Sequence, residues 1–100
     1  MASSTVDIER LAAQIGEQIY LDIAKWHLYL SDARLHTPLA EQVFPMLEEN
    51  TLSSAAVTQI LQGMSVALGG GRKQVSVLDL LPTSGESQLM ELLEEFQRDL

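Results

Sequence analysis

The first third of the chain carries apolar residues mainly at steps of three and four positions, which is the spacing of one face of an α-helix. Ser4 or Thr5 can cap the start of this helix through a side-chain oxygen. No proline follows before Pro38. The pattern therefore predicts one helix from about Thr5 to about Ser31, roughly 40 Å long at 1.5 Å per residue. Its apolar face comprises Ile8, Leu11, Ala12, Ile15, Ile19, Ile23, Trp26 and Leu30.

Two further helices are predicted in the middle of the chain. The pair Thr37-Pro38 is typical of a helix start, because a proline in the first turn loses no hydrogen bond. Pro45 lies inside the apolar stripe that follows, so it should kink this helix or split it in two. Ser53 can cap the next helix, which ends near Gly63. The inward face of that helix is predicted to hold Val57, Ile60 and Leu61.

The pattern then changes to an alternation of apolar and polar residues on both sides of the run Gly69-Gly70-Gly71-Arg72-Lys73. Alternation around a glycine-rich turn predicts a β-hairpin. Two strands alone are only marginally stable in water. We therefore expect the hairpin to lie against a helix or to pair with another chain.

A last helix is predicted after the segment Thr83-Ser84-Gly85-Glu86, which fits a capping box. Its inward face is predicted to comprise Leu89, Leu92, Leu93, Phe96 and Leu100. Its outer face is strongly negative, with Glu91, Glu94, Glu95 and Asp99. Such a face can dock a basic partner, but it more often only keeps a protein in solution.

Together these elements predict a mainly α fold, or α+β if the hairpin is counted, with four to five helices around a long N-terminal helix and one small β-hairpin. A chain of 100 residues with 46% apolar content predicts a single small domain over residues 1–100. The net charge of −8 argues against nucleic acid or an anionic membrane as the main partner. No segment has the roughly 20 apolar residues that span a bilayer. No signal peptide is recognised at the start, so we expect a cytoplasmic location.

Candidate catalytic and metal-binding groups are few. The chain has no cysteine, and its two histidines, His27 and His36, would be half a turn out of phase on one continuous helix. Asp32 and His36 are four residues apart, but two ligands without a third are a weak metal signal. Asp22 lies near the edge of the apolar face, where an ion pair or a hydrogen bond is its more common role. We therefore predict no enzyme, no metal and no cofactor, and we rank catalysis by Asp22 with His27 or His36 last.

The glycine run also invites a comparison with phosphate-binding loops, because glycine N–H groups followed by Arg72 and Lys73 could hold an anion. A P-loop, however, separates its glycines by four residues and leads into a helix. Here the glycines are contiguous, and a strand is predicted to follow. A solvated hairpin turn is the favoured interpretation, although the turn stays a candidate docking place for an anion or an acidic partner.

A second apolar stripe is predicted on the long helix. Leu21 and Leu28 lie seven residues apart on nearly the opposite side from the main stripe, with Tyr20 close by. One apolar face is enough to bury a helix in a two-layer domain. The stripe therefore predicts either a central helix that is covered on both sides or an exposed docking patch, and the sequence leaves both open.

Several segments resemble a family of short cyanobacterial proteins that carry a domain of unknown function. These segments are Glu17 to Leu30, Asp32 to Thr37, Gly69 to Arg72 and Leu78 to Pro82. The resemblance spans nearly the whole chain. It implies a cytoplasmic protein of a photosynthetic bacterium, and it carries no activity, cofactor or site residue over to this chain.

The function that we predict is binding of another protein by a small cytoplasmic module with an assembly or regulatory role. The expected partner is a different protein or a second copy of the chain. The alternative is an anion or small-molecule binding module built on the turn from Gly69 to Lys73. The predicted contact residues are Tyr20, Leu21, Leu28, Arg72 and Lys73.

Overall fold

The computed structural model describes residues 3–23, 26–68 and 73–100. Within them the chain forms five helices and two antiparallel strand pairs, so the predicted mainly α class with a small hairpin is confirmed. The helices are α1 (Ser3–Gln18), α2 (His36–Glu49), α3 (Ser54–Gly63), α4 (Val77–Leu80) and α5 (Gly85–Arg98). The strands are β1 (Tyr20–Ile23), β2 (Trp26–Tyr29), β3 (Ser65–Leu68) and β4 (Lys73–Ser76). We call the pair β1 and β2 hairpin 1, and the pair β3 and β4 hairpin 2.

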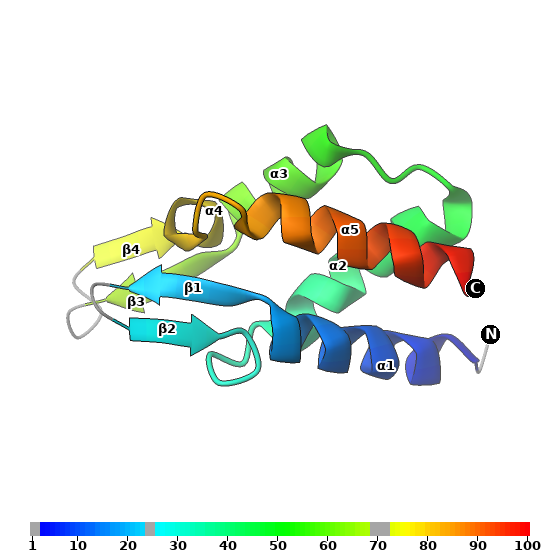
Figure 1. Ribbon diagram of the computed structural model, residues 1–100, viewed down its shortest axis with the longest axis horizontal. Coiled ribbons are helices and arrows are strands. Elements are labelled where there is room, and N and C mark those ends of the chain that lie inside the picture. Colours follow the sequence, from blue (N-terminus) through cyan, green and yellow to red (C-terminus); the bar gives the residue numbers. More distant parts are fainter. Residues whose placement is uncertain (1–2, 24–25, 69–72) are drawn as a thin grey trace.

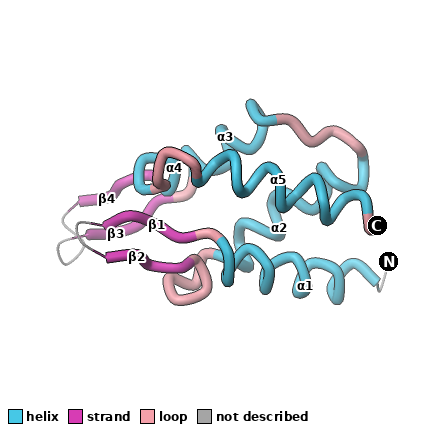
Figure 2. The backbone as a smooth tube through the Cα atoms, viewed as in Figure 1, coloured by secondary structure: helices cyan, strands magenta, loops and turns pink. Residues whose placement is uncertain are grey.

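The molecule is elongated, with extents of 40 × 24 × 20 Å. Both hairpins lie at one end of the long axis, and the start of α1 and the end of α5 lie at the other (Figure 1). Figure 2 shows the same division, with all strands gathered at one end and the longer helices filling the rest. Helix α1 contacts α2 and α5, while α4 contacts β1 and so links the two hairpins. We refer to the strand-bearing end as the hairpin end.

Helix α1 ends at Gln18, and its predicted continuation to Ser31 is wrong. The chain folds back instead as hairpin 1. The physical reason is burial: Ile19, Leu21 and Leu30 are all at most 1% exposed. On a continuous helix Leu21 would point about 200° away from Ile19, and could not share a core with it. The aromatic and β-branched residues of the two strands also favour extended structure.

Hairpin 1 is attached to the end of α1 through backbone and side-chain contacts. The Leu30 N–H donates to the Ile19 carbonyl at 3.0 Å, and the Ser31 N–H donates to the Gly16 carbonyl at 3.3 Å. Gly16 permits this approach, because a Cβ there would lie 2.8 Å from the Ser31 Cβ and 3.2 Å from two atoms of His36. The sequence places a glycine at the position where α1 meets the segment that follows hairpin 1.

The middle helices confirm some predictions and correct others. The Ser53 hydroxyl accepts a hydrogen bond from the Ala56 N–H at 3.1 Å, so the predicted cap of α3 is confirmed. Helix α2 begins at His36 without a side-chain cap, so the predicted Thr37 cap is wrong. The same helix runs unbroken past Pro45, and the predicted split does not occur.

The last third of the chain follows the predicted order. Hairpin 2 lies on both sides of the glycine run, as expected. Helix α5 buries four of its five predicted inward residues, Leu89, Leu92, Leu93 and Phe96. The fifth, Leu100, is 52% exposed because it lies beyond the helix end at Arg98. The predicted capping box is also wrong: the cap position is Ser84, one residue after Thr83, and the Ser84 side chain makes no capping hydrogen bond.

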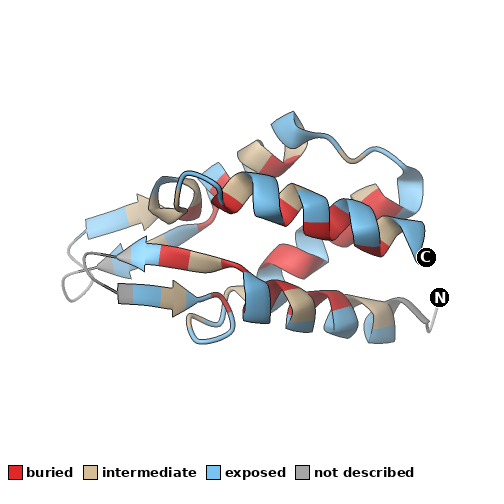
Figure 3. Cartoon of the chain, in the orientation of Figure 1, coloured by how far each residue is buried: buried red, intermediate tan, exposed pale blue. Residues whose placement is uncertain are grey.

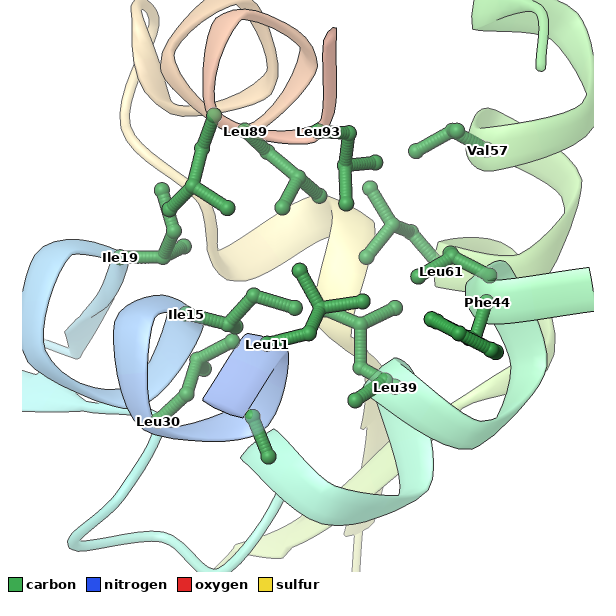
Figure 4. Packing of buried hydrophobic residues seen from close by; sticks show 14 of the residues in the cluster. Leu11, Ile15, Ile19, Leu30, Leu39, Phe44, Val57, Leu61, Leu89 and Leu93 are labelled. Carbon is green, nitrogen blue, oxygen red and sulfur yellow. The ribbon is translucent and has the colours of Figure 1, made fainter. Parts of the chain in front are cut away.

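The hydrophobic core lies between the helices, and exposed residues cover their outer faces (Figure 3). Figure 4 shows Leu11 and Ile15 of α1 converging with Leu89 and Leu93 of α5, next to Leu61 of α3. Each large side chain that is fully buried in this way contributes roughly 1.5–3 kcal/mol. The core therefore fixes the helices firmly, and they in turn position the two hairpins.

Candidate protein-binding surface

The register of hairpin 1 sorts its side chains into two faces. Tyr20 lies opposite Tyr29, and Asp22 lies opposite His27. Because successive strand residues point to opposite sides, these four residues share one face of the hairpin. We call this set the aromatic face. Leu21 and Leu28 also lie opposite each other, but on the inner side.

The rings of the aromatic face contact one another. The Tyr20 and His27 ring centroids are 4.6 Å apart with the planes at 75°, which is an edge-to-face arrangement. The Tyr20 and Tyr29 centroids are 5.6 Å apart with the planes at 54°. Both geometries are favourable for aromatic pairs. Tyr29 nevertheless stays 40% exposed, so the cluster presents ring surface to solvent.

A carboxylate–imidazole pair stands beside the rings. The Nδ1 atom of His27 lies 3.1 Å from Oδ1 of Asp22, and the two side chains are 61% and 48% exposed. This contact places the imidazole beside the Asp22 carboxylate and leaves the carboxylate accessible. Lys25, three positions after Asp22 in the sequence, lies outside the described residues.

The structure separates the predicted stripe residues. Leu21 is fully buried and belongs to the core, so the prediction that it is a contact residue is wrong. Leu28 is half-buried on the same inner side. Tyr20 alone of the three belongs to the aromatic face. Asp22, His27 and Tyr29 complete that face and were not predicted as contact residues.

The second set of predicted contact residues belongs to hairpin 2. Lys73 is exposed at the start of β4, opposite Leu68. Arg72 and the three glycines before it lie outside the described residues. The described residues of both predicted sets, Tyr20, Leu21, Leu28 and Lys73, therefore lie at the hairpin end. The anion-binding alternative for the glycine run stays a prediction.

The enzyme hypothesis gains one contact, and it lies between two exposed side chains. Asp22 and His27 are adjacent on the aromatic face, whereas His36 lies on α2. Open depressions occur elsewhere, such as one of about 290 Å³ between α1 and α5 that is lined partly by Gln18, Gln88 and Glu91. Catalysis by Asp22 with a histidine stays a prediction ranked last.

Other polar residues with notable surroundings lie on α5 and α2, apart from the aromatic face. Glu91, Glu94 and Glu95 are exposed on α5, as predicted for its acidic outer face. The Nδ1 atom of His36 is buried and has no hydrogen-bond partner among the described atoms. Across residues 3–23, 26–68 and 73–100, no group of three or more His, Asp or Glu residues could hold a metal ion.

Comparison with known proteins places the chain in a family. Residues 8–96 match the family described as "Protein of unknown function (DUF3181)". The chain belongs to this family. This confirms the resemblance to short cyanobacterial proteins of unknown function that the sequence showed.

One curated relative of this DUF3181 protein has a location in its name. The chain is 52% identical over 97 residues to the "Thylakoid-associated protein slr0729" of Synechocystis sp. (strain ATCC 27184 / PCC 6803 / Kazusa), covering 97% of this chain and 96% of the relative. No solved structure matches the chain. In the parts of the chain that the structure describes, every helix is too short or too polar to cross a membrane.

Proposed function

We propose that this DUF3181 protein is a small cytoplasmic module that docks on another protein at the surface of the thylakoid membrane. The observation that carries the proposal is the aromatic face, where the rings of Tyr20, His27 and Tyr29 gather on the outer side of one hairpin. The protein serves assembly or regulation through this contact, and it catalyses no reaction.

The composition of the aromatic face supports protein binding. Tyrosine is among the residue types that contribute most to binding energy at protein interfaces. The ring contacts of Tyr20 with His27 and Tyr29 hold these side chains in place before a partner arrives. Pre-ordered side chains lose less conformational entropy on binding. A partner would therefore gain contact area here at a low ordering cost.

Net charge favours a protein over lipid as the docking target. Direct adsorption to an anionic membrane depends on clusters of lysine and arginine. This chain has six basic against fourteen acidic residues. The name of the relative places that protein at the thylakoid, and a protein receptor there would account for a shared location without lipid contact.

A sedimentation assay tests the proposal. Purified chain is mixed either with isolated thylakoid membranes or with protein-free vesicles made from the lipids of the same membranes. We expect it to sediment with the membranes and not with the vesicles, and prior protease treatment of the membranes should abolish sedimentation. Equal binding to vesicles, or no binding to untreated membranes, would contradict the proposal.

A pair of variants assigns the binding to the aromatic face. The double substitution Tyr20→Ala with Tyr29→Ala should weaken membrane binding at least about tenfold, as expected for central tyrosines of an interface. The matched control is Ser65→Ala with Gln74→Ala, which truncates two exposed residues of hairpin 2. Circular dichroism checks that both variants are folded. Equal loss of membrane binding in the two double variants would show that binding does not depend on the aromatic face.

A further inference from the structure

The aromatic face combines a carboxylate with an exposed ring in a way that suits one kind of partner group. We infer that it receives an arginine side chain from a basic segment of the docking partner. This inference rests on the proposed function and names the chemistry of the partner.

The positions of the four residues define the receiving surface. Tyr20 and Tyr29 form one cross-strand pair, and Asp22 and His27 form the next. The Tyr20 and His27 rings are in contact at 4.6 Å across one diagonal of this square. The other diagonal joins Asp22 to Tyr29. Diagonal neighbours on a sheet lie roughly 7–8 Å apart, within reach of one long side chain.

A guanidinium group suits the two residues of the second diagonal, Asp22 and Tyr29. Its planar face stacks on a tyrosine ring, and its N–H groups donate to a carboxylate in a fixed fork. Tyr29 is the exposed ring, and the Asp22 side chain is 48% exposed. The His27 imidazole lies beside this carboxylate, with its Nδ1 atom 3.1 Å from Oδ1. A lysine ammonium lacks the planar shape that would satisfy both contacts at once.

Charge complementarity decides between possible occupants. The chain carries a net charge of −8, so a basic partner is attracted and steered toward it at low salt. A second copy of the chain would bring the same net charge and be repelled. An acidic or neutral apolar segment would leave the Asp22 carboxylate without a counter-charge. The basic segment is the occupant that this surface favours.

The test uses a defined probe and nuclear magnetic resonance of the ¹⁵N-labelled full chain. One synthetic peptide carries three arginines separated by glycine and serine, and a second has citrulline, the uncharged isostere, in place of each arginine. We expect the arginine peptide to shift the amide signals of Tyr20, Asp22, His27 and Tyr29, and the citrulline peptide to bind at least about tenfold more weakly. Equal binding of the two peptides would overturn the inference.

Matched charge variants separate a specific site from general attraction to an acidic protein. Asp22→Asn and Glu91→Gln each remove one negative charge, but only Asp22 belongs to the aromatic face. We expect Asp22→Asn to weaken the arginine peptide about tenfold and Glu91→Gln to weaken it less than about twofold. Equal weakening, or signal shifts concentrated on α5, would show attraction to acidic surface alone and would overturn the inference.

The membrane assay distinguishes failure of this inference from failure of the proposed function. If Tyr20→Ala with Tyr29→Ala abolishes membrane binding while Asp22→Asn leaves it unchanged, the aromatic face docks a protein without using an arginine. If neither variant changes membrane binding, both proposals fail. A concentration-dependent increase in mass of the free chain by sedimentation velocity, lost in the tyrosine variant, would assign the face to a second copy and overturn the inference.

Discussion

Hairpins 1 and 2 share a framework and differ in what they present to solvent. Each pairs two four-residue strands in antiparallel register, and each starts from a buried pair at its base, Ile19 with Leu30 and Met64 with Val77. On hairpin 1 the outer face carries rings and the contact between Asp22 and His27. On hairpin 2 one face carries the small or polar residues Ser65, Ala67, Gln74 and Ser76.

Comparing the two hairpins shows which side chains strand pairing requires and which side chains need another explanation. Hairpin 2 shows that a strand pair at this end of the molecule forms with small polar side chains on one face. The exposed rings of hairpin 1 are therefore not a requirement of strand pairing. Exposed aromatic surface carries a cost in solubility, so a contact role is the explanation that we favour for it.

The two hairpins also differ in how deeply they are anchored, and this gives the largest predicted effect. Leu21 in β1 is fully buried, whereas Val75 in β4 is half-buried. Leu21→Ala should lower the free energy of unfolding by about 2–5 kcal/mol, because it removes buried methyl groups and leaves a cavity. Val75→Ala should cost about 1 kcal/mol. Urea unfolding followed by circular dichroism measures both, and equal losses would refute the difference in anchoring.

A pair of glycines tests the attachment of each hairpin to the helix before it. Gly16 lies in the last turn of α1, and Gly63 ends α3 just before hairpin 2. Gly16→Ala should destabilise the protein by about 1–3 kcal/mol, since the new Cβ would lie 2.8 Å from the Ser31 Cβ.

The Gly63 position provides the control. A Cβ at Gly63 meets nothing within 4 Å. Gly63→Ala should therefore be neutral or stabilise the protein by up to about 1 kcal/mol, through the better helix propensity of alanine. Thermal unfolding of the two variants checks the difference. A neutral Gly16→Ala would mean that the segment after hairpin 1 can move away from α1 at no cost.

The same comparison explains which parts of the fold could be predicted from sequence. Hairpin 2 was predicted because its strands flank a glycine run, a local turn signal. Hairpin 1 was not predicted, because no glycine or proline stands between Ile23 and Trp26. Leu21 and Leu28 are seven residues apart, a spacing that equally fits two helical turns and a cross-strand pair. Only tertiary burial decides between these structures.

A signal of the missed hairpin was nevertheless present. In a half-buried strand, every second residue is apolar. When such residues are plotted at 100° per residue, as on a helix, they fall on two opposite sides. The aromatic face follows from the strand register, since Tyr20, Asp22, His27 and Tyr29 meet only when the chain reverses. The candidate site could therefore be found only after the fold was known, apart from Tyr20.

Coupling between the tyrosines should have a moderate effect on stability. In a double-mutant cycle of Tyr20→Ala and Tyr29→Ala, we expect an interaction energy of about 0.5–1 kcal/mol, because the rings lie 5.6 Å apart in a cross-strand pair. Urea unfolding of the four proteins measures it. A coupling of zero would mean that the rings are not held together before binding, and it would weaken the argument from pre-ordering.

The corresponding polar pair of hairpin 2 should show the smallest effect. The Ser65 hydroxyl donates to Oε1 of Gln74 at 3.2 Å, and the contact is exposed. Because water replaces such a hydrogen bond when it is lost, its contribution is small. A double-mutant cycle of Ser65→Ala and Gln74→Ala should give less than about 0.5 kcal/mol, measured under the conditions used for the tyrosines. A coupling as large as that of the rings would mean that the pair stabilises hairpin 2 as strongly as the rings stabilise hairpin 1. The variants would then no longer serve as a neutral control for membrane binding, and the assignment of function to hairpin 1 would need a control on another element.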